Sequence, residues 1–153
     1  MAITVEKLVN IMKVFAFNHA NLNTFGYGGY PYKVDTVQDL KYPFMWVTKT
    51  KDSNKIGQLN YSFQIAVADR LDSNEKNLLH VQSDCHQICL DFVRYYSRLY
   101  GAATDDDLMD TMLQDNFQTA FIEHVLDNET AGCLLTVTFI CPMNTSYCEI
   151  PQK

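Results

Sequence analysis

The stretch from residue 41 to residue 99 reads KYPFMWVTKTKDSNKIGQLNYSFQIAVADRLDSNEKNLLHVQSDCHQICLDFVRYYSRL, and it decides the fold. Its centre, residues 59–68, alternates strictly between two kinds of side chain. One parity carries Leu59, Tyr61, Phe63, Ile65 and Val67, and the other carries Asn60, Ser62, Gln64, Ala66 and Ala68. A period of two predicts a half-buried strand.

A second strand is predicted just before this one, at residues 44–48. Pro43 opens the run Phe-Met-Trp-Val-Thr, which is apolar on both parities. We therefore expect it to be covered on both faces or paired with a neighbouring subunit. The connection, residues 49–58, is polar and holds Gly57, which predicts an antiparallel hairpin that projects into solvent or toward a partner.

The pattern switches to helical spacing after residue 77. Asp72 and Glu75 have the spacing of a capping box, so we expect a helix that follows them, runs to about Tyr100 and ends at Gly101. Its apolar stripe follows steps of three and four residues. The stripe consists of Leu78, Val81, Cys85, Ile88, Phe92, Tyr95 and Leu99.

The flanking segments complete an α+β pattern. Thr4 is placed to cap a helix that ends near residues 18–21, and residues 23–32 predict a short irregular strand and a loop. Residues 102–110 form an acidic connection in which Leu108, Met109 and Met112 would make a short helix. Residues 117–126 and 133–143 predict a second hairpin.

The expected fold is a single domain over residues 1–153, an antiparallel sheet of four to five strands packed against two main helices in the order α-β-β-α-β-β. The side chains predicted to form its core come from both hairpins and from the long helix. They are Trp46, Phe63, Ile65, Cys85, Cys89, Phe92, Val137 and Phe139.

Composition limits the function. The chain has a formal net charge of −6 with 12 Lys and Arg residues, which argues against a dedicated nucleic-acid reader. No run of residues is long and apolar enough for a membrane span, and the first 17 residues do not resemble a signal peptide. The five cysteines are odd in number and most lie in apolar patterns, which predicts reduced thiols in a cytosolic setting.

Thiol chemistry is the main catalytic alternative. Cys85, His86 and Cys89 could be imagined as a metal or redox site, but helical positions one residue apart point about 100° apart, which favours packing of the two sulfurs instead. A reactive Cys89 or Cys141 would need an imidazole nearby, which spacing alone does not supply from His19, His80 or His124. Cys141 and Cys148 flank a turn and could approach each other. We predict no catalytic residue, no metal and no cofactor.

Two segments are predicted to contact other subunits. Tyrosines give stiff, amphipathic contact area, and four gather at Tyr27, Tyr30, Tyr32 and Tyr42. A loop folded over its own core explains them equally well. The hairpin loop presents Lys49, Lys51, Asp52, Asn54 and Lys55, whose lysines could pair with an acidic neighbour or simply be solvated.

The strand at residues 41–47, the polar turn, residues 59–65 with Asp69 and the long helix together resemble a family of small phage proteins. With the amino-terminal helix and residues 23–28, this pattern is similar to the tail terminator or tail-to-head joining proteins of tailed bacteriophages, including those of Bacteroidetes-infecting phages. The resemblance implies a closed ring of six or twelve copies around the channel through which the genome leaves the capsid. It also implies that residues 49–58 form the long hairpin that makes intersubunit or lumen contacts.

The functional expectation is thus a structural virion protein, made in the host cytoplasm, that contacts itself and neighbouring portal, neck or tail proteins. DNA would pass through the ring without sequence-specific binding, since an acidic lumen makes few phosphate contacts. The alternative is a small cytosolic α+β binding domain or a thiol enzyme with a pocket between sheet and helices.

Overall fold

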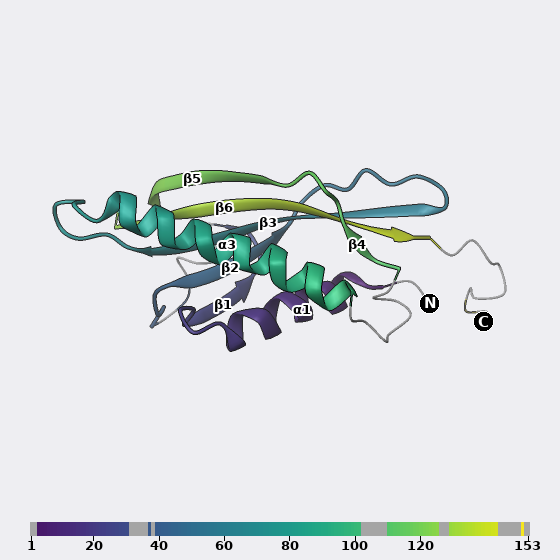
Figure 1. Ribbon diagram of the computed structural model, residues 1–153, viewed down its shortest axis with the longest axis horizontal. Helices are drawn as coiled ribbons and strands as arrows, with labels where there is room; N and C mark the ends of the chain where they lie inside the picture. Colours follow the sequence, from purple (N-terminus) through teal and green to yellow (C-terminus); the bar gives the residue numbers. More distant parts are fainter. Residues whose placement is uncertain are drawn as a thin grey trace.

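The computed structural model describes residues 3–30, 37, 39–101, 110–125, 129–143 and 151. Its described elements form an α+β arrangement in which each helix is followed by three strands (Figure 1). In chain order they are α1 (Val5–Asn18), β1 (Thr24–Tyr27), β2 (Phe44–Lys49), β3 (Gln58–Arg70), α3 (Leu78–Gly101), β4 (Met112–Leu113), β5 (Gln118–Val125) and β6 (Thr130–Pro142).

The sheet has six strands and is mixed, which corrects the expected antiparallel sheet of four to five strands in the order α-β-β-α-β-β. Its strand order is β1-β2-β3-β6-β4, and β5 also pairs with β6. β1 runs parallel to β2, whereas every other pairing is antiparallel. β1 lies in the segment that was predicted to hold a short irregular strand, whereas β4 has two residues, too few for a periodic pattern to mark it.

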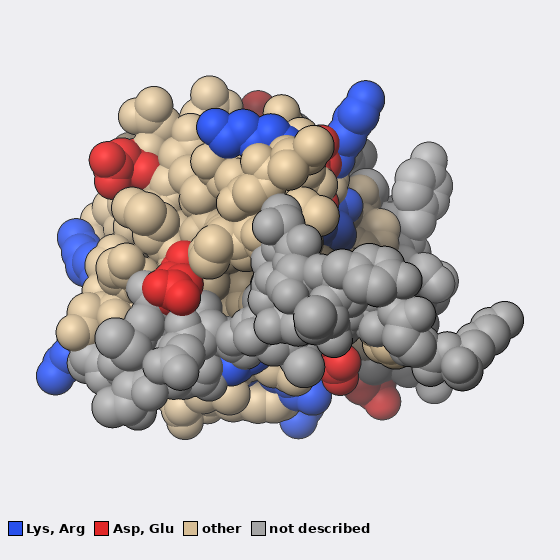
Figure 2. All heavy atoms as spheres, turned by 90° about the vertical axis from the view of Figure 1, so that its right-hand side faces the viewer, with Lys and Arg blue, Asp and Glu red and all other residues tan. Residues whose placement is uncertain are grey.

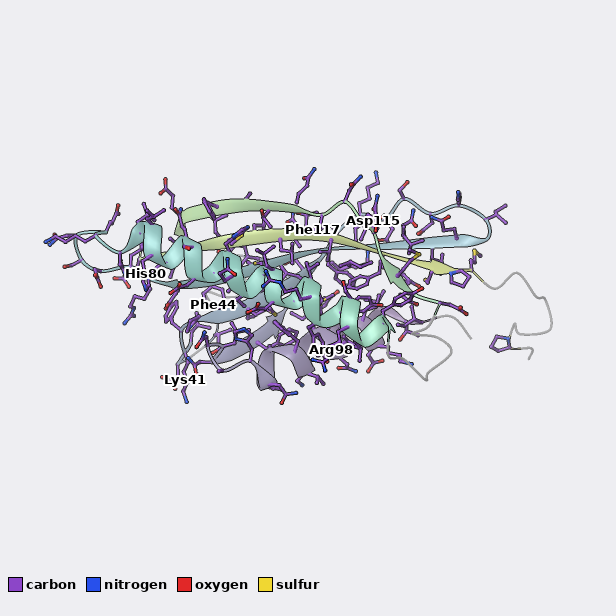
Figure 3. All side chains as sticks on the ribbon, viewed as in Figure 1. Lys41, Phe44, His80, Arg98, Asp115 and Phe117 are labelled. Atoms are coloured by element: carbon purple, nitrogen blue, oxygen red, sulfur yellow. The ribbon has the colours of Figure 1, made fainter. Side chains whose placement is uncertain are left out.

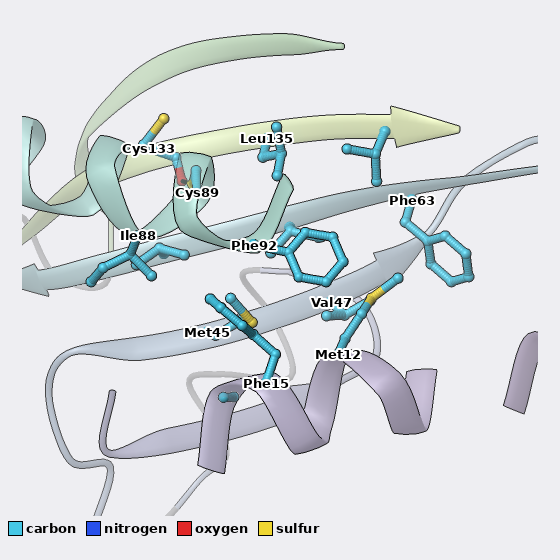
Figure 4. Close-up of a cluster of buried hydrophobic side chains, with 14 of the residues drawn as sticks. Met12, Phe15, Met45, Val47, Phe63, Ile88, Cys89, Phe92, Cys133 and Leu135 are labelled. Atoms are coloured by element: carbon cyan, nitrogen blue, oxygen red, sulfur yellow. Dashed lines mark hydrogen bonds between the residues drawn. The ribbon is translucent and has the colours of Figure 1, made fainter. Parts of the chain in front are cut away.

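Both helices cover one face of the sheet and share a single apolar core with it (Figure 4). Met12 and Phe15 of α1 meet Met45 and Val47 of β2, and the Phe15 ring packs edge-on against Phe92 of α3 at 5.4 Å between centroids. The N-terminus of α1 is capped as predicted, because the Thr4 hydroxyl accepts the Lys7 N–H at 3.2 Å. The strand parity that starts at Leu59 faces this core.

The opposite face of the sheet is also covered at one end. Phe44 and Trp46 of β2 and Ala66 and Ala68 of β3 are buried there in a second cluster, against which Tyr42 and other partly buried side chains pack. β2 is thus buried on both faces, as its sequence predicts. On this face of β3, the side chains near the hairpin are half-buried. Ala66 and Ala68, farther from the hairpin, are fully buried.

The long helix begins at Leu78, where its helical spacing starts, but it is not capped as its sequence predicts. The capping-box expectation is wrong, because Glu75 has a φ of 54° and its N–H bonds the Asp72 carbonyl in a turn. The side-chain oxygen of Asn77 accepts the Asp72 N–H at 2.9 Å, so Asp72 is held by this loop rather than acting as a cap. α3 then starts at Leu78.

The buried stripe of α3 also differs at its C-terminal end. Tyr96 is fully buried, while the predicted Tyr95 is only half-buried beside Phe15. The cause is a tertiary bond, since the Tyr96 hydroxyl donates to the Thr111 carbonyl at 2.8 Å. Met112 belongs to β4 and not to a short helix. The rest of that predicted helix, with Leu108 and Met109, lies outside the described residues.

Candidate interaction surfaces

The hairpin between β2 and β3 ends in a tight two-residue turn. Lys55 and Gln58 bond each other in both directions, at 3.1 and 3.0 Å, and Gly57, the second central residue of the turn, has a positive φ of 86°, which glycine adopts readily. Ile56 occupies the other turn position and is 90% exposed. Along the long axis of the molecule the hairpin reaches beyond the end of α3 (Figure 1). An isoleucine is thereby displayed at the tip of a projection.

Side chains from residues 50–55 hold the hairpin against the edge of β3. The Asp52 carboxylate accepts the Ser62 N–H at 2.9 Å, and the Asn54 side-chain oxygen accepts the Asn60 N–H at 2.8 Å. The side-chain amide of Asn60 in turn donates to the Ser53 carbonyl at 2.6 Å. These bonds replace the strand-to-strand ladder that β2 no longer supplies beyond Lys49. The projection is therefore ordered by these polar side chains and by β6, which pairs with β3 as far as Gln58 and donates the Met143 N–H to the Gly57 carbonyl at 3.1 Å.

The five predicted loop residues have different surroundings. Lys49 is partly buried, paired with Asp52 and placed over the Phe63 ring at 5.5 Å, so it stabilises the hairpin from within. Lys51, Asn54 and Lys55 are exposed and Asp52 is half-buried. Figure 2 shows this end of the molecule, where acidic and basic side chains are scattered instead of forming one patch.

The predicted tyrosine cluster divides between solvent and the protein's own sheet. Tyr27 of β1 is exposed, whereas Tyr42 packs against Phe44 at 5.7 Å and has the Arg70 guanidinium over its ring. Tyr30 packs against Phe44 as well, at 6.4 Å. Tyr30 and Tyr42 thus follow the alternative in which the loop covers its own core, and Tyr32 lies outside the described residues.

A shallow apolar hollow of about 310 Å³ lies where α1 meets β1. Val5, Val9 and Tyr27 line it, with Glu6 and Asn10 beside them. This feature was missed in the sequence, because Val5 and Val9 recur at the same helical spacing as the buried Leu8 and Met12, so spacing alone does not separate them from the core. Ile56 was missed for the opposite reason, since one apolar residue in a polar turn carries no periodic signal.

The predicted core residues are all buried in the structure, including Cys85 and Cys89. Burial, with nearby acidic groups, raises the pKa of Cys85 to about 12. A side-chain hydrogen bond with Cys133 and burial raise the pKa of Cys89, and burial raises that of Cys141. Higher pKa values leave less thiolate at neutral pH, so these thiols are not activated nucleophiles.

The histidines do not join these thiols. His19 pairs with Asp91 at 3.1 Å, His80 pairs with Asp84 at 3.2 Å, and His86 packs its ring against Phe121. Cys148, Asp105, Asp106 and Asp107 lie outside the described residues, as does the side chain of His124. Within the described ranges, no group of three or more His, Cys, Asp or Glu side chains is arranged to hold a metal ion.

Comparison with known proteins gives no family for this chain. No protein-family model matches it, and no curated protein matches it. In the described part of the chain, neither helix combines the length and the apolar character needed to cross a membrane. The functional conclusion therefore depends on the surfaces described above.

Proposed function

We propose that this protein is a structural assembly subunit that forms a closed ring in the neck or tail of a tailed bacteriophage. The observation that carries the proposal is the projecting hairpin with Ile56 at its tip. Ile56 is 90% exposed, and contact with a partner would remove this apolar surface from water. The bonds that order residues 50–55 reduce the entropy lost when such a contact forms.

A ring made by head-to-tail contacts needs two different patches that fit each other. The hairpin supplies the first, an apolar tip beside the exposed Lys55. The hollow between α1 and β1 supplies the second, with apolar walls and the Glu6 carboxylate at its side. In the proposed contact, Ile56 of one subunit enters the hollow of the next, and Lys55 approaches Glu6.

The phage assignment rests on the family resemblance of residues 41–99 and of the amino-terminal segments. It implies six or twelve copies, contacts with portal, neck or tail proteins, and a place in the virion. A net charge of −6 suits a channel wall along which DNA moves without being held. The thiol-enzyme alternative has less support, because Cys89 and Cys141 are enclosed and the pKa of each is raised.

Native mass spectrometry of the purified chain tests the hairpin contact. We expect discrete ring-sized oligomers for the wild type, and we expect Ile56→Asp to remove them and leave only smaller species. Leu79→Asp is the matched control, because Leu79 is also a highly exposed aliphatic residue, at 75%, but lies on α3. Equal oligomer populations in the wild type and both variants would show that the hairpin tip does not make the contact between subunits.

A further inference from the structure

One edge of the sheet is formed by β5, whose only described partner is β6. Side chains on both of its faces are exposed, and Phe121 retains 55% of its surface although its ring packs edge-on against His86 at 5.8 Å. Phe117, labelled in Figure 3, directly precedes the strand and is also exposed. This edge therefore combines a row of backbone groups with exposed aromatic area.

Sheet edges are usually protected by lysine, proline, bulges or a covering segment. Residues 117–123, with the sequence FQTAFIE, contain no lysine, arginine or proline. A register shift appears only at the far end, between Glu123 and Val125. The regular part of the edge thus lacks these protecting residues.

The edge of β3 near the hairpin, in contrast, is protected. Where β2 ends, the N–H groups of Asn60 and Ser62 in β3 are bonded by the side chains of Asn54 and Asp52, at 2.8 and 2.9 Å. β5 has no comparable cover among the described residues. The contrast within one chain indicates that the β5 edge serves for pairing with another strand.

For a second copy of the chain as the partner, the charge pattern of β5 selects the orientation of pairing. Its single charge, Glu123, lies near one end of the strand. Two copies paired in parallel would place these carboxylates side by side. Two antiparallel copies centred on Ala120 would separate them by about 20 Å, at roughly 3.4 Å per residue, well beyond the screening length in physiological salt. That register sets Phe121 opposite Thr119 of the second copy, an aromatic with a β-branched residue, which is a favourable cross-strand pair.

We propose that β5 pairs antiparallel with β5 of a second copy about a two-fold axis, joining two sheets through their edges. This contact is separate from the head-to-tail ring contact of the hairpin. It would join subunits of two different rings or form a free dimer. It is symmetric, since the same residues meet from both sides.

The test uses sedimentation velocity in the Ile56→Asp background, so that the hairpin contact cannot contribute. We expect a dimer that dissociates on dilution and that is lost when Phe121→Lys is added. Phe17→Lys is the matched control, since Phe17 is 70% exposed and belongs to a helix, α1, and not to a strand. Circular dichroism verifies folding, and Gln118→Lys, which adds an edge lysine at an exposed position, serves if Phe121→Lys does not fold.

Hydrogen exchange provides a second readout in the same background. The β5 amides should exchange more slowly at high protein concentration than at low concentration, and Phe121→Lys should abolish that difference. A monomer at every concentration in the Ile56→Asp background would overturn the β5 proposal while leaving the ring untouched. A wild type that forms only this dimer would instead refute the ring and support the edge contact.

Discussion

At the scale of single residues, close backbone approach at Gly132 is the strictest requirement of the fold. A Cβ added there would lie 1.9 Å from the Val67 carbonyl oxygen and 2.7 Å from the Ala68 Cα, both in the backbone of β3. Gly132→Ala should therefore cost about 1–3 kcal/mol or more of unfolding free energy, because β3 and β6 must move apart. Gly29→Ala is the control, since nothing lies within 4 Å of its added Cβ. Equal melting temperatures for the two variants would contradict this packing.

The buried thiol of Cys85 makes stability depend on pH. Burial raises its pKa from an ordinary value near 9 to about 12. Both states hold the proton below pH 9. Between pH 9 and 12 the unfolded chain releases the proton while the folded chain keeps it, so the free energy of unfolding falls as pH rises, by up to about 1.4 kcal/mol per pH unit.

Urea denaturation between pH 8 and pH 10.5 measures this effect, with Cys85→Ala as the comparison. The variant should start less stable, because a buried sulfur is removed, yet lose stability with pH less steeply than the wild type. The pH dependence of the unfolding free energy that remains in Cys85→Ala comes from other groups whose pKa is raised by burial, among them Cys141 and Tyr61. Identical slopes would show that Cys85 does not hold its proton as described.

At the scale of elements, the hairpin depends on Asp52. Its carboxylate accepts the Ser62 N–H and pairs with Lys49, so Asp52→Ala should cost about 1–2 kcal/mol and accelerate exchange of the Ser62 amide. Exchange measured by NMR resolves this amide from those in the centre of β3. Lys51→Ala, an exposed neighbour, should leave it unchanged. Unaltered Ser62 exchange in Asp52→Ala would mean that the loop does not protect the β3 edge.

The elements with long periodic patterns were predictable from sequence. β3, β6 and the body of α3 have alternating or helical spacing over many residues, and β2 is buried on both faces as its composition indicates. β4 was not predictable as a strand, and the short strand predicted at β1 could not be placed in the sheet, because both pairings depend on contacts far along the chain. For β1, the space left by Gly26 admits the Trp46 ring, to which an added Cβ would come within 2.0 Å.

The candidate surfaces were predictable only in part. The polar turn located the hairpin, but whether a loop side chain faces solvent or its own hairpin depends on tertiary contacts. Lys49 turns inward onto aromatic rings, and Tyr42 packs on Phe44. Conversely, Ile56 could be identified as a candidate contact residue only from the structure of the turn, in which its side chain is exposed.

At the scale of the whole molecule, one face of the sheet is covered by the helices, whereas apolar side chains are exposed at the hairpin tip and at the β5 edge. The helices fill one face, and the exposed apolar groups include Ile56 at the hairpin tip and Phe121 at the β5 edge. A subunit with such separate surfaces is suited to contact several neighbours at once. Its proposed function is structural, since copies of the subunit would assemble into a closed ring.

Negative-stain electron microscopy tests that claim most directly, applied to the purified chain alone and mixed with the products of its neighbouring genes. We expect closed rings of uniform diameter with a central channel, and we expect Ile56→Asp to remove them while Leu79→Asp does not. Single particles of monomer or dimer size in every one of these samples would contradict the proposed ring.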